Sequence, residues 1–531
     1  MSKAQKNFLN GALILSSSAL IAKAISAVYK IPLANMIDTV GMNYYNDAYQ
    51  IYALLFMLAT GGVPVAIAKM VSETIVNKRL KEPRKILKVS ALIFGILGIL
   101  FSVLLAVFVE PLSHLLASET ANHCITLIAP SIFMVSVSAT VKGYFQGYKC
   151  MTPTAVYQVI EPTFKLAGLA IVGVMLLRGV TDPMILACGG VLGVTSGAFA
   201  ATVFMLIRYL TEKDFGRNTE ESLPSRSGWT IAKLVATIAV PITLSSSVTS
   251  ITNTLDMFLV KWGLGQYGLD NDAIKSVYGA YSGGTSSLFN LVPSLITSVG
   301  VSVLPFITSA LAAKNQEEAF RNMRSSSKVV ALLAIPSAVG MTVMSEPIVK
   351  LLYRQSYWNV TIPTLRLMGI SIFFVSFVSL TAVFLQAAGK VKLTLLTTAI
   401  GALMKLAVNM TMVPEIGIMG APLGTFACYG TIAVLNIIFI KKYTGFRFPL
   451  KSTFLKPAFC GLVCCGGAYG IWAFLCFIGL SQRLAVLPAL AAAVVIYGIL
   501  LLLLKVLNKE DLSLLPKRVG AILERKGWVH E

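Results

Sequence analysis

Long uninterrupted apolar runs constrain this chain more than any other feature of its sequence. Residues 91–109 and 486–504 contain no charged side chain. A helix needs about 20 apolar residues to cross a bilayer, where every backbone polar group must be bonded within the segment. A transmembrane β-barrel would instead alternate over segments of about ten residues. We therefore expect an all-α polytopic membrane protein.

The composition agrees with this class. Of the 531 residues, 56% are apolar and 13% are charged, whereas a soluble domain carries about 25% charged residues. The formal net charge of +21 comes from short clusters of Lys and Arg between the apolar runs, which is the pattern of cytoplasmic loops. We therefore expect no nucleic-acid partner.

The eight cysteines and three histidines form no metal-binding spacing. No CxxC pair occurs and most cysteines lie inside apolar runs, so we expect packed thiols rather than metal ligands or disulfides. P-loop, HExxH and GxSxG motifs are also absent from the sequence. We expect a non-enzyme without a cofactor, and coupling to Na+, H+ or the membrane potential is a hypothesis.

The apolar runs predict fourteen membrane-spanning helices. Their ranges are 8–29, 46–74, 88–109, 122–146, 154–177, 183–208, 231–258, 278–310, 327–351, 362–387, 392–413, 416–440, 455–479 and 484–507.

The distribution of Lys and Arg predicts the orientation. With the N-terminus in the cytoplasm, the inner segments hold 32 of these residues and the outer segments seven, so both termini are expected inside. Lys23 interrupts the place where a signal peptide would be cleaved, which indicates an uncleaved first helix. Residues 508–531 place apolar side chains at helical spacing among basic ones, which predicts an amphipathic cytoplasmic tail.

An internal duplication is the next feature. Three matches carry it: EPLSHLL at 110–116 recurs as EPIVKLL at 346–352, the Gln146 to Lys165 spacing recurs from Gln386 to Lys405, and Val63-Pro64 matches Leu304-Pro305. The offsets lie near 240 residues and cover six helices, an even number, so the two halves have the same orientation.

The duplication predicts the domain organisation. We expect an N-terminal lobe at 1–210, a cytoplasmic linker at 211–230, a C-terminal lobe at 231–440, two further helices at 441–507 and the tail at 508–531. Two lobes around a cavity are typical of alternating-access transport, although a channel or a scaffold could share the duplication.

Charged residues within spans are costly and tend to be functional. Lys23 lies ~22 Å along the first helix, and Lys30 follows on the same face ~10 Å further. Two stacked cations suit a diphosphate. The alternative is that Lys30 extends to the outer interface while Lys23 pairs with a buried acceptor.

Other polar residues form a second group of candidates. Lys165 and Lys405 are symmetry-related midplane cations, and Glu161 one turn from Lys165 favours an intrahelical pair. These three, together with Gln146 and Gln386, are candidates for coupling or for polar contacts within a lobe.

Helix-breaking residues indicate where spans bend. Gly61, Gly62 and Pro64 occur in the second span, and Gly300 and Pro305 in the eighth. Such positions make hinges plausible, and a static kink is the equal alternative.

Asp256 and Asn290 lie on the seventh and eighth spans. Both are polar enough to line a cavity, where we expect them to bind substrate, or to coordinate a coupling cation.

Five segments resemble a known family. They are GVPVAIAKMVSE at 62–73, KGYFQGYKCMTPTAVYQVIEP at 142–162, VYGAYSGGTSSLFNLVPS at 277–294, IPSAVGMTVMSEPIVKLLY at 335–353 and IGIMGAPLGT at 416–425. The chain thus resembles the stage V sporulation protein B and polysaccharide flippase branch, with its lipid II flippases, of the multidrug/oligosaccharidyl-lipid/polysaccharide exporter superfamily.

This resemblance implies fourteen helices, two lobes and flipping of an undecaprenyl-diphosphate-linked sugar in peptidoglycan or polysaccharide biosynthesis, with roles in the cell wall, cell shape or sporulation. It places Lys23 and Lys30 at the diphosphate, and the last two helices beside the lipid tail. The chain departs from the family where Leu54-Leu55-Phe56 replaces an arginine, and where a polar stretch ending in Asn290 replaces a charged pair.

The sequence therefore predicts an alternating-access flippase in a bacterial cytoplasmic membrane. Its expected partners are the lipid-linked sugar diphosphate, bilayer lipids and proteins of cell-wall synthesis. The alternatives are a cation-coupled multidrug exporter and a non-transporting scaffold of envelope assembly.

Overall fold

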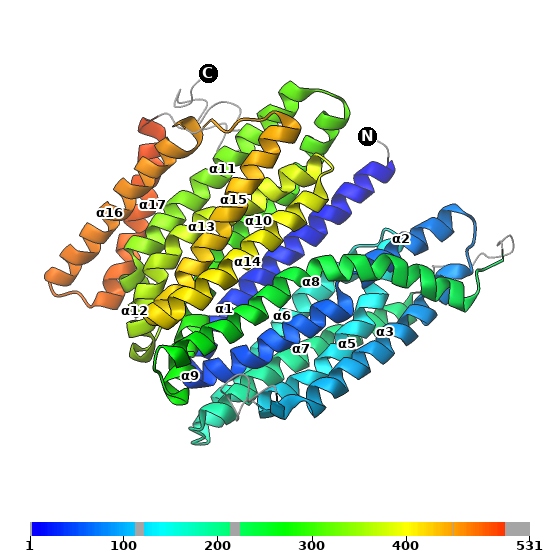
Figure 1. Ribbon diagram of the computed structural model, residues 1–531, viewed down its shortest axis with the longest axis horizontal. Helices are drawn as coiled ribbons and strands as arrows, with labels where there is room; N and C mark the ends of the chain where they lie inside the picture. The colour runs from blue at the N-terminus through cyan, green and yellow to red at the C-terminus, as the bar shows by residue number, and fades with distance from the viewer. Residues whose placement is uncertain (1–2, 112–121, 213–223, 450, 505–531) are drawn as a thin grey trace. The chain divides into compact units, whose positions relative to one another are not determined.

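A computed structural model describes residues 3–111, 122–212, 224–449 and 451–504. Within these ranges every regular element is a helix (Figure 1), which confirms the all-α class. Four predicted features fall wholly or partly outside the described residues: the repeat at 110–116, the linker at 211–230, the last span at 484–507 and the tail at 508–531.

The described helices include ten that are long and apolar enough to cross a membrane, or eleven if a bent pair within 228–266 counts as one span. Two of the ten candidate spans contain more than one helix. Ser17–Val76 (60 residues) includes most of α1 and all of α2, and Val391–Thr444 (54 residues) includes α14, η4 and α15. Each is more than twice the roughly 20 residues of one crossing. The chain is a multi-pass membrane protein, and the number fourteen stays a prediction.

The first compact unit comprises Met1–Lys261 and Leu269–Gly279. Its helices are α1 (Lys3–Thr60), α2 (Val63–Val76), α3 (Glu82–Val107), α5 (Asn122–Gly147), α6 (Thr152–Leu177), α7 (Pro183–Thr211), most of α8 (Gly228–Gln266) and α9 (Asn271–Ala280). Proline occupies the first or second position of α2, α3, α6 and α7. The fixed φ of proline suits a helix start, and its missing N–H is not needed there.

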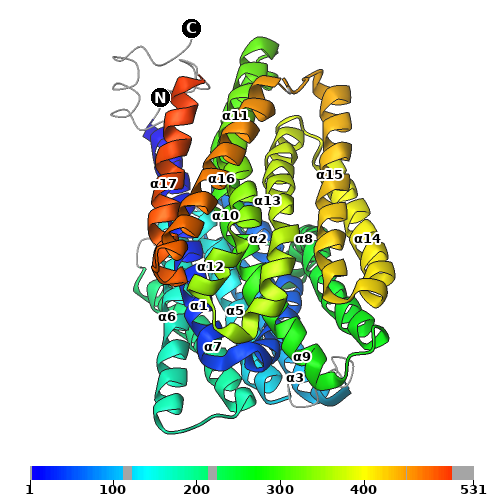
Figure 2. The ribbon, with the colours of Figure 1, turned by 90° about the vertical axis from the view of Figure 1, so that its left-hand side faces the viewer.

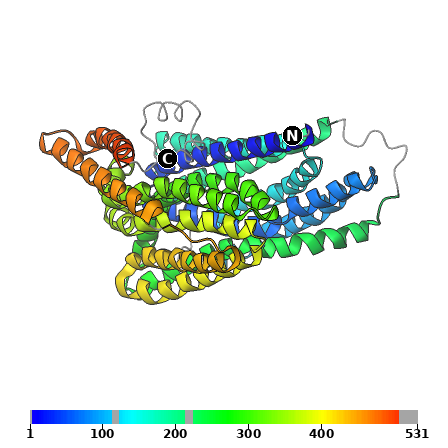
Figure 3. The ribbon, with the colours of Figure 1, turned by 90° about the horizontal axis from the view of Figure 1, so that it is seen from above.

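The second unit comprises Trp262–Gly268 and Ala280–Glu531. Its elements are η2 (Tyr281–Thr285), α10 (Ser286–Ala312), α11 (Gln316–Val343), α12 (Ser345–Leu352), η3 (Gln355–Tyr357), α13 (Trp358–Ala387), α14 (Val391–Ile416), η4 (Gly417–Met419), α15 (Gly420–Thr444), η5 (Lys451–Leu455), α16 (Lys456–Phe477) and α17 (Gln482–Leu503). Figure 2 shows α16 and α17 as a paired hairpin, and Figure 3 shows α14 and α15 side by side.

Each unit has its own apolar core. In the first unit, buried residues of α2, α3, α5, α6, α7 and α8 pack together around Ile67, Phe145 and Met205. In the second, residues of α10, α11, α13 and α15 pack around Phe384, and a separate cluster joins α16 and α17 through Trp472. The boundary between the two units lies within residues 261–280. The predicted lobes at 1–210 and 231–440 were instead defined by the internal duplication of the sequence. Their boundaries therefore stay a prediction.

Two breaks interrupt the helical segment that ends at Val76. At Asp38 the backbone has φ 59° and ψ −172°, so α1 consists of two helices joined by a kink. The second break is the turn at Gly61-Gly62 between α1 and α2, where the sequence predicts a bend. A Cβ atom on Gly62 would collide with the carbonyl oxygen of Ala239, so glycine lets α8 pack directly against this turn. Pro305 lies inside the continuous helix α10, as does Gly300.

Candidate functional site

Lys23 and Lys30 lie on the first part of α1, before the kink at Asp38. One uninterrupted helix therefore carries both, and their seven-residue spacing puts them on one face ~10 Å apart. The side chain of Lys23 is exposed, and that of Lys30 is partly buried. The helix thus presents two ammonium groups along one line, which is the geometry that the sequence predicts.

A polar cluster on α5 and α6 surrounds the predicted Glu161–Lys165 pair. The structure shows this pair, with Lys165 Nζ 3.2 Å from Glu161 Oε1 and both side chains mostly buried. Tyr49 of α1 places its ring 5.8 Å from Lys165 Nζ. On α5, Lys142 Nζ lies 3.2 Å from the centre of the Tyr157 ring, a cation–π contact.

Lys142 is a member of this cluster that the sequence alone did not single out. It is the first residue of the segment KGYFQGYK, which carries part of the family resemblance. The sequence predicts Lys142 to be one of the basic residues on the cytoplasmic side. The contact with Tyr157 instead places it inside the helical bundle. The cluster holds two cations and one carboxylate, so it carries an excess of one positive charge.

The remaining predicted polar residues are dispersed. Gln146 donates a weak hydrogen bond from Nε2 to Thr154 Oγ1 at 3.4 Å, which links the ends of α5 and α6. Gln386 is exposed in the last turn of α13, and Lys405 is partly buried on α14. Asp256 is partly buried on α8, whereas Asn290 is exposed and donates from Nδ2 to the carbonyl of Ser286 in its own helix.

Among the residues that the structure describes, the most buried ion pair is one that the sequence did not predict. Lys261 Nζ of α8 lies 2.6 and 2.7 Å from the two carboxylate oxygens of Asp47 in α1, and the side chains are 2% and 0% exposed. Asn43 donates a further hydrogen bond to Asp47 at 3.0 Å, and the Tyr278 ring lies 4.9 Å from Lys261 Nζ. Such a pair overcomes its desolvation cost only with this kind of geometry.

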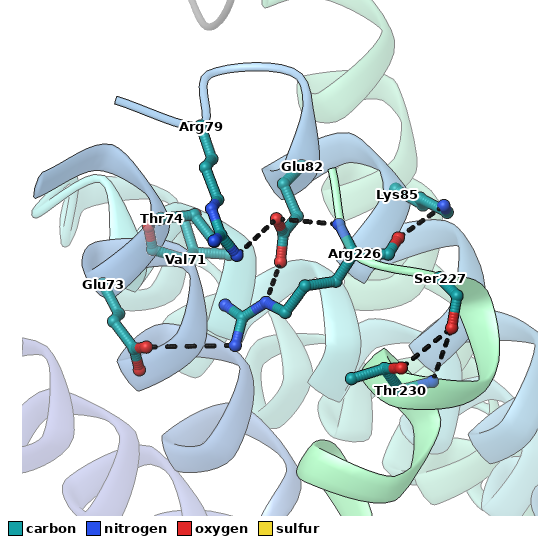
Figure 4. A network of polar contacts seen from close by, with 9 residues as sticks. All are labelled: Val71, Glu73, Thr74, Arg79, Glu82, Lys85, Arg226, Ser227 and Thr230. Carbon is teal, nitrogen blue, oxygen red and sulfur yellow. Dashed lines mark hydrogen bonds and ion pairs between the residues drawn. The ribbon is translucent and has the colours of Figure 1, made fainter. Parts of the chain in front are cut away.

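A second polar network links Arg226, just before α8, to the start of α3 (Figure 4). Glu82, the fully buried first residue of α3, accepts hydrogen bonds from the Nε and backbone N–H of Arg226 at 2.5 and 3.2 Å. Lys85 donates to the carbonyl of Arg226 at 2.6 Å, while Arg79 lies 3.7 Å from Glu82 and Glu73 lies 3.9 Å from Arg226. The start of α8 is thereby tied to the turn between α2 and α3.

An apolar groove of about 390 Å³ lies in the second unit. Its walls come from α10, α11, α16 and α17, and they include Leu332, Met341, Leu490 and Tyr497. The position beside the last two described helices is where the family resemblance expects a lipid tail. Among the described residues, no group of three or more His, Cys, Asp or Glu side chains could hold a metal ion.

Apolar helices of this length, gathered into two compact units, define a multi-pass membrane protein, and the first unit also buries charged pairs. The chain belongs to the family described as polysaccharide biosynthesis protein, whose model matches residues 8–311. The MatE family model also matches, at residues 241–411. The superfamily resemblance found in the sequence is confirmed.

Individual proteins agree with this assignment. Stage V sporulation protein B of Bacillus subtilis (strain 168) is 24% identical over 518 residues, which cover 97% of this chain and 98% of that protein. Lipid II flippase MurJ of the same organism is 23% identical over 468 residues, covering 83% and 84%. A solved structure of lipid II flippase MurJ in an inward closed conformation has a TM-score of 0.70 at 17% identity and covers 92% of this chain and 98% of that one.

Proposed function

We propose that this protein is an alternating-access flippase for an undecaprenyl-diphosphate-linked cell-wall precursor, either lipid II or a related lipid-linked oligosaccharide. The observation that carries the proposal is the line of two lysines on α1, Lys23 and Lys30, in a protein of transporter architecture. Two relatives, one named as a lipid II flippase and the other as a sporulation protein, also support a role in transport of a cell-wall precursor.

The chemistry of a diphosphate fits these lysines. A diphosphate brings two or more negative charges into a medium of low dielectric constant, where each needs a compensating positive charge. Charge-assisted hydrogen bonds from ammonium groups to phosphate oxygens are short and about twice as strong as neutral ones. Lys23 and Lys30 are the residues we assign to this contact.

The proposal includes a location and a driving force. We place the protein in the bacterial cytoplasmic membrane with both termini in the cytoplasm, because of the excess of Lys and Arg in the predicted inner segments. The sequence has no nucleotide-binding motif, so we propose a membrane potential or an ion gradient as the driving force and a transport rather than an enzymatic activity.

The test is transport by the purified protein in liposomes containing a fluorescent lipid II analogue. We expect Lys23→Gln to reduce flipping at least tenfold, because loss of one charged hydrogen bond in a low-dielectric site costs more than 1.4 kcal/mol. Lys392→Gln, which removes an exposed lysine elsewhere, is the matched control and should flip like the wild type.

Two outcomes would contradict the proposal. Wild-type flipping by a normally inserted Lys23→Gln variant would move the diphosphate contact elsewhere, with Lys165 and Lys405 next to be tested. A wild-type protein that translocates no lipid-linked diphosphate, and does not rescue a strain lacking its lipid II flippase, would refute the function itself.

A further inference from the structure

A polar pocket lies at the shared end of α3, α5 and α7 in the first unit, and none of its lining residues belongs to the proposed diphosphate contact. Its volume is about 280 Å³, and its lining residues are Arg84, Lys88, Tyr144, Tyr209, Leu210 and Glu212. Arg84 and Lys88 belong to the first two turns of α3, Tyr144 to the last turn of α5, and the other three to the end of α7. The pocket therefore sits where three apolar helices end, at the level of a membrane surface.

The charges of this pocket favour an anion. Arg84 and Lys88 are four residues apart on one face of α3, and both side chains are exposed. The one carboxylate in the lining, Glu212, is neutralised by Arg208, whose guanidinium lies 2.7 Å away. Lys88 has no hydrogen bond or ion pair with any other residue in the described ranges. By formal charge, the lining and its neighbour Arg208 hold three basic side chains and one acidic side chain.

The tyrosines give the pocket a fixed wall. Tyr144 is only 2% exposed, and its ring packs edge-on against Tyr209 at 5.7 Å and Tyr148 at 5.1 Å. Tyrosine is enriched at membrane interfaces because its ring is apolar and its hydroxyl donates hydrogen bonds to polar groups.

An apolar surface adjoins the charged part of the pocket. Leu210 in the lining is 77% exposed, and Ile207 one turn before it on α7 is 55% exposed. In a membrane protein such residues face hydrocarbon chains. A molecule bound here would contact cations at one end and lipid-facing side chains at the other. A phospholipid matches this arrangement, because it has a charged headgroup and apolar acyl chains.

We infer that this pocket binds a phosphate group, and that the headgroup of an anionic phospholipid of the adjacent leaflet supplies it. Basic pockets between transmembrane helices on the cytoplasmic side are known to hold acidic headgroups. Arg84 can bind two phosphate oxygens at once, while Lys88 adds a point charge. The inference does not depend on which lipid the protein transports.

The experiment uses the full chain purified in detergent and native mass spectrometry with added phosphatidylglycerol or phosphatidylcholine. We expect Arg84→Gln/Lys88→Gln to retain about tenfold less phosphatidylglycerol than the wild type, because two charged contacts to phosphate are lost. Retention of the zwitterionic phosphatidylcholine should not change. The control, Lys78→Gln/Lys81→Gln, removes the same charge from the neighbouring turn outside the pocket and should bind both lipids as the wild type does.

A second variant should increase phosphatidylglycerol retention, a result that a misfolded protein would not give. Glu212→Gln removes the only acidic group of the lining and releases Arg208, so phosphatidylglycerol retention should rise about threefold. Inorganic phosphate and glycerol 3-phosphate form a separate arm. If millimolar concentrations of either compound displace phosphatidylglycerol, the pocket binds phosphate but a soluble phosphate, not a lipid, is its ligand. If neither compound displaces phosphatidylglycerol, the lipid headgroup is supported as the ligand. Unchanged phosphatidylglycerol retention in both the double variant and Glu212→Gln would overturn the inference.

Discussion

Among individual residues, the contact between Asp47 and Lys261 differs most from the sequence prediction. The seventh span was expected to end at 258, which left Lys261 in an outer loop, whereas α8 continues to Gln266. A lysine after an apolar run normally marks the end of a span. Here Asp47 compensates the charge within 2.6 Å, so the helix continues and buries the lysine. The partner comes from a segment more than 200 residues away, so no local pattern could reveal it.

Breaking this pair should destabilise the protein strongly. Lys261→Met leaves the Asp47 carboxylate buried without its cation, and we expect the free energy of unfolding to fall by about 3–5 kcal/mol. Lys275→Met, which breaks an ion pair with the exposed Asp272, should cost under about 1 kcal/mol. Denaturant titration in detergent micelles measures both.

The double variant Asp47→Leu/Lys261→Met should recover much of the lost stability, because no buried charge then lacks a partner. Equal stability of Lys261→Met and Lys275→Met would show that the buried pair contributes no more than a surface pair.

Among the helices, the features that could be predicted are those that follow from the type of residue at a given position. The break between α1 and α2 falls at Gly61-Gly62, as expected from two adjacent glycines. The kink at Asp38 has no such signal, because a positive φ is uncommon outside glycine. The Asp38 carboxylate accepts a hydrogen bond from the Thr39 N–H at 2.7 Å, which stabilises this conformation locally. The intrahelical Glu161–Lys165 pair was predictable because its spacing is local.

Close packing of α9 against α1 gives a prediction about these two helices. A Cβ atom on Gly279 would overlap the carbonyl oxygen of Thr39, so Gly279→Ala must push the helices apart. We expect a loss of about 2–3 kcal/mol in the free energy of unfolding. Gly430→Ala in α15 meets no atom within 4 Å and should be neutral or slightly stabilising. Thermal unfolding in detergent compares the two, and equal midpoints would refute the packing argument.

At the scale of the whole molecule, the apolar runs and the composition were sufficient to predict the membrane class and the helical architecture. Three of the five quoted segments, at 62–73, 142–162 and 277–294, lie within residues 8–311, which the family model matches. The substrate was not predictable in the same way. Sequence identity with the sporulation and lipid II relatives is 23–24%, at which fold persists while the few side chains that select a ligand diverge.

The orientation of the chain can be tested at two exposed turn residues. In a variant without the eight native cysteines, Arg178→Cys should react with a membrane-impermeant maleimide added to intact cells, and Asn77→Cys should react only after permeabilisation. These expectations follow from the positive-inside distribution. The reverse pattern would invert the topology and place both termini outside.

The Asp47–Lys261 pair also has an electrical consequence. A single charge that moves through a membrane potential of 100 mV gains or loses about 2.3 kcal/mol. Two opposite charges held 2.6 Å apart form a dipole with no net charge, so they can be displaced together at almost no electrical work. The Glu161–Lys165 pair has the same property. Replacing Lys261 by a neutral side chain would leave one negative charge on α1 and would make any displacement of that helix sensitive to voltage.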